Sequence, residues 1–440
     1  MTTPVAIDTA LRLDPPTGPR QVLGDIASTL VGSEILKIAG QVRKLREDGR
    51  TVCDLTVGDF APAQFRIPQE LESGIARALA AGQTNYPPSD GMPELRKAVQ
   101  AFYERALGLS YPLESVLIAG GARPVIWAAY RAVMNAGDTV VYPVPSWNNN
   151  HYVHLCRGKD VAVPTRPENG FQPTAEELAP HLAGARMLAV NSPLNPAGTG
   201  FGREQLEAIT RLVVEENHRR EARAAAGGEA ERPLFLLYDH IYWLLAAADA
   251  PHWTPVGLVP EAAPYTIFVD GISKAFAATG LRVGWAVAPP YITKRMRDLL
   301  GHVGAWAPKP EQVASAELIA KEGLCESLAT GLRDRLLERL RALYTGLRAM
   351  GATRLPVDAL PPAGALYLSA RFDLLPQLGS NEAIRAFLLE KAGFAVVPFQ
   401  AFGLQEENGW FRLSVGAVSL EQIAEALPRV EAAIRELLGR

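Results

Sequence analysis

The sequence of 440 residues contains only three cysteines, Cys53, Cys156 and Cys325. They lie far apart, without the short spacing that is typical of metal-binding cysteines, and an odd number does not suit a disulfide framework. The seven histidines include no HxxxH or HExxH pair, so we expect no metal site. The scarcity of cysteine fits a reducing compartment, and we expect a cytoplasmic protein.

Long apolar runs and an excess of charge of one sign are also missing. No run approaches the roughly 20 residues of a membrane-spanning helix, since the longest, such as LFLLY and IYWLLAAA, have the size of core elements. The first 20 residues show no basic segment followed by an apolar one, so we expect no secretory signal. The formal net charge of −3 argues against binding to nucleic acid or to an anionic membrane.

Hydrophobic residues make up 48% of the chain, which is ample for a large core. Short, continuously apolar segments alternate with helical patterns; these are TVCDLTV (51–57), VLIA (116–119), TVVYP (139–143), MLAVN (187–191), LFLLY (234–238), TIFVD (266–270) and VGWAVA (283–288). Continuous apolar strands separated by helices indicate an α/β domain with a parallel sheet covered on both faces.

Beyond about residue 310 the pattern changes to a long helical region, 311–349, followed by short strands and two further helices. We therefore expect a large domain over 61–310 and a smaller α+β domain over 311–440. Residues 1–60 are expected to form an N-terminal arm and part of the small domain. The charged, glycine-containing segment 217–232 predicts a solvated insertion.

Several strands are followed by residues suited to ligand binding, at the edge where open parallel sheets bind ligands. After VLIA comes GGARP, in which Gly121, Ala122 and Arg123 open a helix. Glycine lets backbone N–H groups come close to a ligand, and the free N–H groups of a helix start suit phosphate. Taken alone, GGARP is more typical of an ordinary strand–helix turn.

The residues that follow the next strands also have structural explanations, as alternatives to ligand binding. Trp147 follows TVVYP, where an aromatic residue fills a core more often than it stacks on a planar ligand. Asn195 lies in SPLNPAGTG, a segment typical of a rigid turn. Asp239 and Tyr242 follow LFLLY, and a carboxylate after a buried strand needs a positive partner.

The segment SKAFAATGLRVGW (273–285) follows TIFVD and contributes Ser273, Lys274 and Arg282. A buried lysine must give up its proton or find a partner. One ligand needs the whole set of strand-end residues, pyridoxal 5′-phosphate. The expected partners are the helix start with Ser273 and Arg282 for its phosphate, Trp147 for its ring, Asp239 for its ring nitrogen, Asn195 and Tyr242 for its phenolic oxygen, and Lys274 for a Schiff base with its aldehyde.

Five segments, in this order, resemble the class I/II aminotransferases, which are fold type I enzymes that depend on pyridoxal phosphate. The segments are TNYPPSDGMPELRKAV (84–99), NSPLNPAG (191–198), DHIY (239–242), GISKAFAATGLRVG (271–284) and FRLSVG (411–416). The resemblance covers essentially residues 30–438. It implies a mixed, mostly parallel sheet covered by helices in a large domain, together with a smaller α+β domain.

The resemblance also implies roles for individual residues. Lys274 would hold the cofactor covalently, and Arg412 would bind the α-carboxylate of the substrate, a bidentate task suited to guanidinium. Tyr86 would reach the phosphate in the neighbouring subunit, which implies a homodimer with shared active sites. Gly58, Trp147 and Asn195 are further expected to contact the substrate.

The expected activity is the transfer of an amino group between an amino acid and a 2-oxo acid in a ping-pong reaction. Arg123 opens a helix, where the helix dipole disfavours a cation. It either points to solvent or supports the phosphate, or, as the resemblance implies, binds a second carboxylate of the substrate; we expect the last. Aspartate or glutamate, with 2-oxoglutarate or oxaloacetate, is then the expected substrate pair. Trp306, in a loop where the family often has small polar residues, favours an aromatic or bulky substrate instead. A lyase or synthase with the same cofactor is another alternative.

Overall fold

The computed structural model describes residue 18, residues 22–32 and residues 34–440. The chain divides into two units, residues 1–32 and residues 33–440. The described part of the first unit contains the short helix α2 (Asp25–Ser28). The elements discussed below belong to the second unit.

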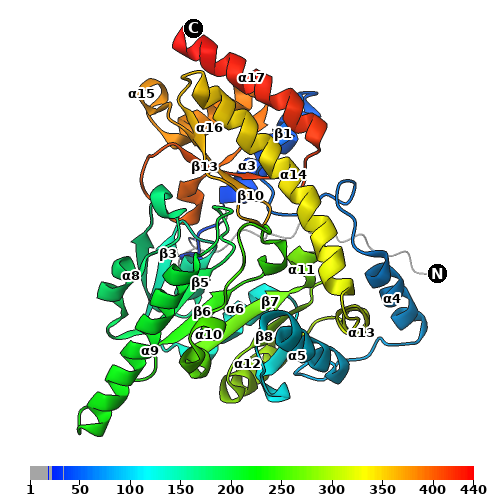
Figure 1. Cartoon of the computed structure of the whole chain (residues 1–440), viewed down its shortest axis with the longest axis vertical. Helices are drawn as coiled ribbons and strands as arrows, with labels where there is room; N and C mark the ends of the chain where they lie inside the picture. Colours follow the sequence, from blue (N-terminus) through cyan, green and yellow to red (C-terminus); the bar gives the residue numbers. More distant parts are fainter. Residues whose placement is uncertain (1–17, 19–21, 33) are drawn as a thin grey trace, which may run out of the picture. The chain divides into compact units, whose positions relative to one another are not determined.

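Six of the seven expected apolar segments, together with the unexpected strand β4, form a seven-stranded sheet with the order β2-β8-β7-β6-β5-β3-β4 (Figure 1). The segment 51–57 does not belong to this sheet, because its strand pairs elsewhere. Its strands are β2 (Val116–Ala119), β3 (Thr139–Val144), β4 (Lys159–Pro164), β5 (Ala185–Asn191), β6 (Phe235–Asp239), β7 (Thr266–Gly271) and β8 (Gly284–Val287). Neighbouring strands from β4 to β7 run parallel, whereas β8 runs antiparallel to both β2 and β7. The sheet is therefore mixed and mostly parallel. The connection from β7 to β8 holds only the one-turn helix α11 (Ile272–Ala275), which explains why the chain turns back there instead of crossing over.

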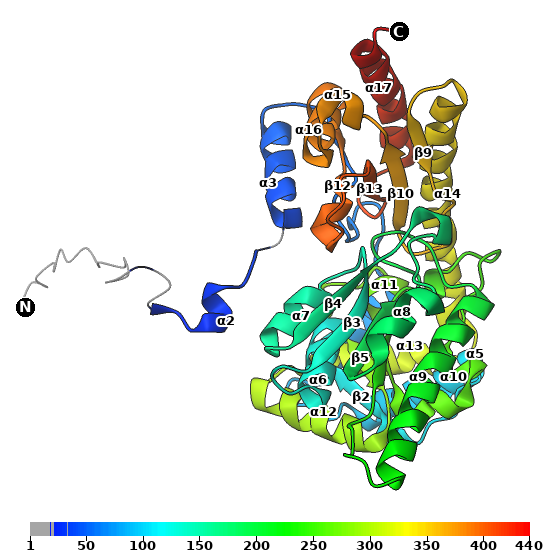
Figure 2. The same cartoon turned by 90° about the vertical axis from the view of Figure 1, so that its left-hand side faces the viewer.

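Alternate residues of the strands enter two different cores, one on each face of the sheet. Val116 and Ile118 of β2 belong to a core with α5, α8 and α9, while Leu117 and Ala119 belong to a core with α6 and α12. The helices are α5 (Pro93–Leu107), α6 (Ala122–Val133), α8 (Ala175–Leu182), α9 (Arg203–Ala225) and α12 (Pro290–Val303). Figure 2 shows the strands lying between these helices. Burial on both faces is the reason that the strands read as continuous apolar runs.

A second group of strands forms an antiparallel sheet of four strands, in the order β12-β13-β10-β9, and a parallel pair of β1 with β11. The strands are β1 (Cys53–Asp54), β9 (Val357–Ala359), β10 (Tyr367–Phe372), β11 (Phe394–Ala395), β12 (Val397–Pro398) and β13 (Trp410–Ser414). Three helices share one apolar core with the four-stranded sheet: α14 (Leu324–Ala352), α16 (Asn381–Ala392) and α17 (Leu420–Leu438). The helix α14, yellow in Figure 1, also contacts the short helix at Trp243–Leu245 beside the large sheet. The domain boundaries at residues 60 and 310 remain a prediction.

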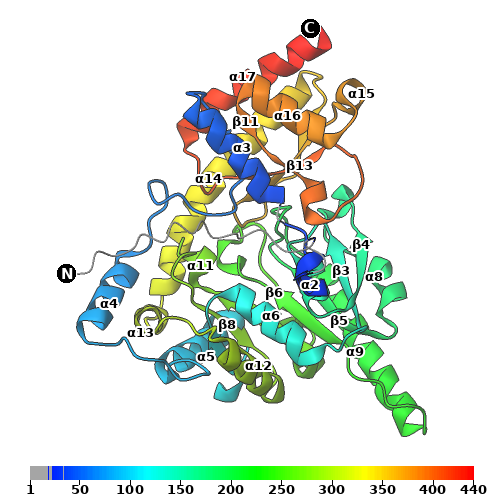
Figure 3. The same ribbon diagram turned by 180° about the vertical axis from the view of Figure 1, so that it is seen from behind.

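The remaining helices pack around these layers. They are α3 (Glu34–Glu47), α4 (Gln69–Ala80), α7 (Asn149–Leu155), α10 (Pro255–Leu258), α13 (Lys309–Ile319) and α15 (Leu375–Leu378). Figure 3 shows α4, α5 and α13 side by side. No helix of the described residues is both long enough and apolar enough to cross a membrane.

The segment 217–232, expected as a solvated insertion between a helix and a strand, is largely exposed, but the expectation that the helix ends before it is wrong, because α9 continues to Ala225. Asn217 and Arg220 are buried and bind main-chain carbonyl oxygens. The Asn217 amide donates to Leu234 and the Arg220 guanidinium to Ala185, at 2.9 and 2.8 Å. These bonds hold the extended helix against the strands, whereas most other residues of 218–232 are exposed.

Candidate active site

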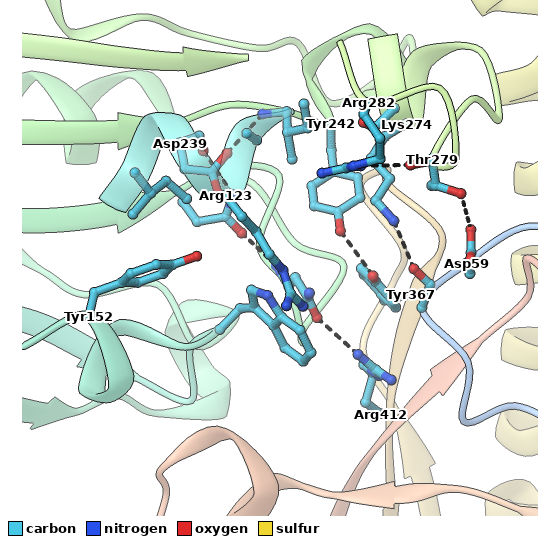
Figure 4. A pocket seen from close by; sticks show the side chains of 18 residues that line it. Asp59, Arg123, Tyr152, Asp239, Tyr242, Lys274, Thr279, Arg282, Tyr367 and Arg412 are labelled. Carbon is cyan, nitrogen blue, oxygen red and sulfur yellow. Dashed lines mark hydrogen bonds between the residues drawn. The ribbon is translucent and has the colours of Figure 1, made fainter. Parts of the chain in front are cut away.

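A cavity of about 410 Å³ lies at the carboxyl ends of the parallel strands (Figure 4). Asn191 ends β5, Asp239 ends β6, and Lys274 stands in α11 directly after β7. Tyr367 and Arg412 reach the same cavity from β10 and β13 of the four-stranded sheet. The cavity thus lies where the two sheets meet, so residues far apart in the sequence share it.

The structure brings most of the expected site residues together. The cavity is lined by Gly58, Ala122, Arg123, Trp147, Asn195, Asp239, Tyr242, Ser273, Lys274, Arg282 and Arg412. Gly121 directly precedes the lining residue Ala122 at the start of α6. Tyr86 does not line the cavity of its own chain; its side chain is 81% exposed, and its ring packs edge-on against Trp306 with the centroids 5.3 Å apart.

Lys274 is partly buried, and its Nζ atom donates a hydrogen bond of 2.7 Å to the carbonyl oxygen of Gly58. Burial lowers the pKa of this amine to about 8, and the nearby guanidinium groups add to the effect, while the carboxylate of Asp59 opposes it. The amine therefore loses its proton more easily than an ordinary lysine, as a nucleophile or a general base requires.

Arg412 is 1% exposed and lies in the cavity wall. Its Nη1 donates to Asn195 Oδ1 at 3.2 Å and its Nη2 to the carbonyl oxygen of Thr56 at 2.5 Å. Its Nε is buried and has no hydrogen-bond partner within the described part of the chain. A buried N–H without an acceptor is costly, so this guanidinium suits an anionic ligand such as a carboxylate.

Arg282 lies against the start of α6. It donates to the carbonyl oxygens of Thr279 and Gly120 at 2.6 and 3.1 Å, and a methyl group at Gly121 would come within 2.2 Å of its Nη2. Burial, and then the charge of Arg123, lower the pKa of Arg282. The repulsion between the two guanidinium groups would be relieved by an anion, and the free N–H groups of the helix start favour the same ligand.

Asp239 is the acidic counterpart on the other side of the cavity. Burial raises the pKa of Asp239 to about 6. Two weaker effects lower it: a hydrogen bond of 3.1 Å that Oδ1 accepts from the N–H of Ile241, and the charge of Lys274. Trp147 lines the same cavity, with the guanidinium carbon of Arg123 5.4 Å from the ring centroid. Figure 4 shows Arg123 extending from the side of Asp239 into the cavity. A flat ligand with a cationic nitrogen would satisfy both the carboxylate and the aromatic plane.

Sequence reasoning missed several lining residues: Asp59, Ile126, Tyr152, Asn191, Ile241, Thr279 and Tyr367. The Asp59 carboxylate accepts a hydrogen bond from Thr279 Oγ1 at 2.5 Å, and the hydroxyl oxygens of Tyr367 and Tyr242 are 2.9 Å apart. Asp59 directly follows the expected residue Gly58, which was an available signal. The sequence gives no comparable signal for Tyr367, except that it lies in an apolar strand. Among the described residues, no three or more His, Cys, Asp or Glu side chains are grouped as a metal would need.

A cavity at the strand ends of an α/β fold, with a partly buried lysine of lowered pKa, is typical of an enzyme active site. Residues 50–220 and 229–430 match the family described as aminotransferase class I and II. The chain belongs to this family and is an aminotransferase.

Individual relatives match over nearly the whole chain. The aspartate aminotransferase of Rhizobium meliloti (strain 1021) is 30% identical over 427 residues, which cover 93% of this chain and 95% of the relative. The aspartate/prephenate aminotransferase of Thermus thermophilus is 31% identical over 413 residues, covering 93% and 96%. The solved structure of Thermus thermophilus aspartate aminotransferase with maleate is 30% identical, with a TM-score of 0.82 over 93% of this chain and 99% of that one. The resemblance and the fold class expected from the sequence are thereby confirmed.

Proposed function

We propose that this aminotransferase uses pyridoxal 5′-phosphate to move an amino group between aspartate or glutamate and a 2-oxo acid, 2-oxoglutarate or oxaloacetate, in a ping-pong reaction. The observation that carries the proposal is the cationic cavity. The Lys274 amine shares it with three guanidinium groups, those of Arg123, Arg282 and Arg412. Such a cavity suits a ligand with a phosphate and a substrate with two carboxylates.

The cavity residues fit each part of the cofactor. Gly121, Ala122, Ser273 and Arg282 would bind its phosphate. Trp147 would stack on its ring, Asp239 would bind its ring nitrogen, and Asn195 and Tyr242 would bind its phenolic oxygen. Lys274 would form a covalent bond to its aldehyde carbon. Arg123, which lies over Trp147, would move aside to let the ring stack. When bound, the cofactor supplies an electron sink for the negative charge that develops at the substrate Cα.

Two protein groups manage protons during the reaction. Lys274, with a pKa of about 8, is partly deprotonated near neutral pH and would take the proton from the substrate Cα and later return one. Asp239, whose pKa burial raises to about 6, would become more acidic beside a cationic ring nitrogen. Its charge would then keep that nitrogen protonated.

The substrate carboxylates have two candidate partners. Arg412, with its unpaired Nε, would bind the α-carboxylate, and Arg123 would bind the distal carboxylate. Asn195 already orients Arg412 through a hydrogen bond, and Gly58 borders the substrate while its carbonyl holds Lys274. The similar Thermus thermophilus enzyme was solved with maleate, a dicarboxylate.

An aromatic amino acid is the second candidate substrate, because Ile126, Trp147 and Tyr152 give the cavity an apolar side. The two candidates are separated by kcat/KM for aspartate and for phenylalanine with the same 2-oxo acid. A ratio in favour of phenylalanine would contradict the acidic substrate.

We also propose a homodimer in which Tyr86 reaches the cofactor phosphate of the partner subunit. The support is that Tyr86 is largely exposed and stands outside its own cavity. A cytoplasmic location is part of the proposal, because Cys53, Cys156 and Cys325 are all free thiols.

The test of the function uses the visible absorbance of the purified protein. Aspartate alone should convert the band of the aldehyde form of the cofactor to that of the amine form, and 2-oxoglutarate should restore it. Release of ammonia or pyruvate without an acceptor would show a lyase instead. Borohydride reduction followed by peptide mapping should label Lys274, and a label on another lysine would contradict the assignment.

A further inference from the structure

The hydroxyl groups of Tyr242 and Tyr367 meet at the wall of the cavity, although the residues come from different sheets. Tyr242 follows β6, while Tyr367 is the first residue of β10. The oxygens lie 2.9 Å apart, and the rings meet edge to face with centroids 5.6 Å apart. Both side chains are buried, at 4% and 1% exposure. The pair therefore forms a fixed contact between the two sheets.

The hydrogens of this pair can be counted. Burial raises the pKa of both phenols, so each keeps its hydrogen near neutral pH. Their mutual bond uses one hydrogen and leaves one free to donate to a third group. Among the described residues, Tyr242 is the hydrogen-bond partner found for the Tyr367 hydroxyl, and a methyl group at Gly58 would lie only 2.8 Å from that hydroxyl. Backbone thus closes the Gly58 side of the Tyr367 hydroxyl.

The ring of Tyr367 also touches the carboxylate-binding candidate Arg412. In the pairing of β10 with β13, Tyr367 lies opposite Ser414 and Ser369 lies opposite Arg412, so Tyr367 and Arg412 are diagonal neighbours on one face. The guanidinium carbon of Arg412 is 4.9 Å from the Tyr367 ring centroid, and 4.8 Å from that of Phe402. The two rings hold the guanidinium in place.

We propose that Tyr367 is a positioning residue of the transamination site, donating its hydrogen to Tyr242 so that the Tyr242 hydrogen points into the cavity. There the Tyr242 hydroxyl would donate to the phenolic oxygen of the cofactor, so this inference rests on the proposed function. With the same side chain Tyr367 supports Arg412. Tyr367 then orients both the hydroxyl that donates to the cofactor oxygen and the guanidinium that binds the substrate carboxylate.

The test is a double-mutant cycle on the holoenzyme, read from the pH titration of the cofactor absorbance without substrate. Tyr367→Phe keeps the ring and removes the donor. Because hydrogen bonds to the cofactor oxygen favour its anionic form, the midpoint should rise by roughly 0.5–1 pH unit. In a Tyr242→Phe background the same change should cause no further shift. Tyr344→Phe, on α14 outside the cavity, is the control and should leave the midpoint unchanged.

The outcomes of this titration separate the role of Tyr367 from the proposed function. A Tyr367→Phe shift of equal size in both backgrounds would show that Tyr367 acts independently of Tyr242 and would overturn the proposal, as would no shift in either. Absence of a cofactor band in the unmodified protein would instead overturn the proposed function, and this role with it.

The ring contact has its own readout, the affinity for maleate measured by the absorbance change on binding. Tyr367→Phe should change this affinity less than 2-fold, whereas Tyr367→Leu, which removes the ring, should weaken it at least 5-fold. Equal effects of the two variants would refute the support for Arg412. Thermal unfolding of each variant shows whether it is folded.

Discussion

The Nζ atom of Lys274 lies 2.7 Å from the carbonyl oxygen of Gly58, although the two residues are 216 positions apart. Gly58 follows β1, and Lys274 follows β7 in the large sheet. The N-terminal strand segment therefore holds the amine at the cavity. Because an amine can donate this bond with or without its extra proton, the contact orients Lys274 without fixing its charge.

The acidity of Lys274 should depend on Asp59. The Asp59 charge works against the lowered pKa of about 8, so Asp59→Asn should lower it further. In cofactor-free protein, the pH at which an amine reagent labels Lys274 at half its maximal rate should move downward from about 8. Asp334→Asn, at an exposed position on α14, is the matched control and should have no effect. An upward shift in Asp59→Asn would contradict this account.

The close approach of β8 to the start of α6 predicts a sharp difference between two glycines of one segment. A methyl group at Gly284 would lie 2.6 Å from the carbonyl carbon of Gly121, whereas one at Gly280 would meet nothing within 4 Å. Gly284→Ala should therefore destabilise the protein by roughly 1–3 kcal/mol and weaken cofactor retention. Gly280→Ala should stay within about 0.5 kcal/mol. Thermal unfolding and cofactor release by dialysis measure both, and similar behaviour of the two variants would be inconsistent with the packing described.

Most parts of the site that the sequence predicted follow continuously apolar strands, whereas Arg412, inside β13, was expected from the family resemblance alone. Asp239 and Lys274 could be assigned to one edge because parallel strands bring their carboxyl ends together. The strand β4 was missed, since its residues are mostly exposed at the edge of the sheet and break the apolar pattern. The helical continuation after residue 216 was also missed, because buried polar anchors such as Arg220 look like surface residues in a sequence.

The contacts between the two sheets could not be predicted. Tyr367 meets Tyr242 only through the pairing of β10 with β13 and the packing of that sheet on the cavity. Such register and packing depend on the whole chain, and no local pattern encodes them. The influence of Asp59 on Lys274 likewise depends on a fold that brings together residues far apart in the sequence.

Two neighbouring histidines, the buried His240 and the partly buried His252, should make stability depend on pH. His240 and His252 lie with ring nitrogens 3.4 Å apart. Burial lowers the pKa of His240 well below its ordinary value and that of His252 to about 3. Unfolded histidine has a pKa near 6.5, so the stability that these groups contribute is present above that pH and is lost as the pH falls toward about 3.

The neighbouring Asp270 acts in the opposite direction. Its carboxylate lies 3.9 Å from His240, and burial raises its pKa to about 7, so its contribution to stability is lost as the pH rises through about 7. Asp239, whose pKa burial raises to about 6, acts in the same direction as Asp270. Two carboxyl groups therefore oppose the two histidines, and a single histidine is tested by comparing a variant with the unmodified protein. The denaturant midpoint of His252→Gln relative to that of the unmodified protein should rise as the pH falls from about 7 to about 5, because the variant lacks one histidine that protonates only when unfolded. His302→Gln, at an exposed position, should show no such rise, and the absence of a rise in His252→Gln would contradict the prediction.

Shared active sites predict complementation between two inactive variants. If Tyr86 serves the partner's site, a mixture of Tyr86→Ala and Lys274→Ala chains should regain activity, because some hybrid dimers have one site with both residues intact. The control is a mixture of Lys274→Ala with chains carrying both changes, in which every site lacks Lys274. Activity of the first mixture no higher than that of the control, or a monomer by sedimentation, would refute the shared site.

Substrate choice should depend on Arg123, a cation at the start of α6, where the helix dipole disfavours it. Its guanidinium lies 5.4 Å from the Trp147 ring centroid and on the cavity wall. Arg123→Leu should lower kcat/KM for aspartate by roughly 1.5–3 kcal/mol, or about 10- to 150-fold. The value for alanine, which has no distal carboxylate, should hardly change.

Arg123→Lys should keep part of the activity toward aspartate, since it preserves the charge without the fork of donors. Arg131→Gln, on the same helix but outside the cavity, is the control. An equal loss for aspartate and alanine in Arg123→Leu would assign Arg123 to the cofactor or to the helix, and the preference for an acidic substrate would lose its support.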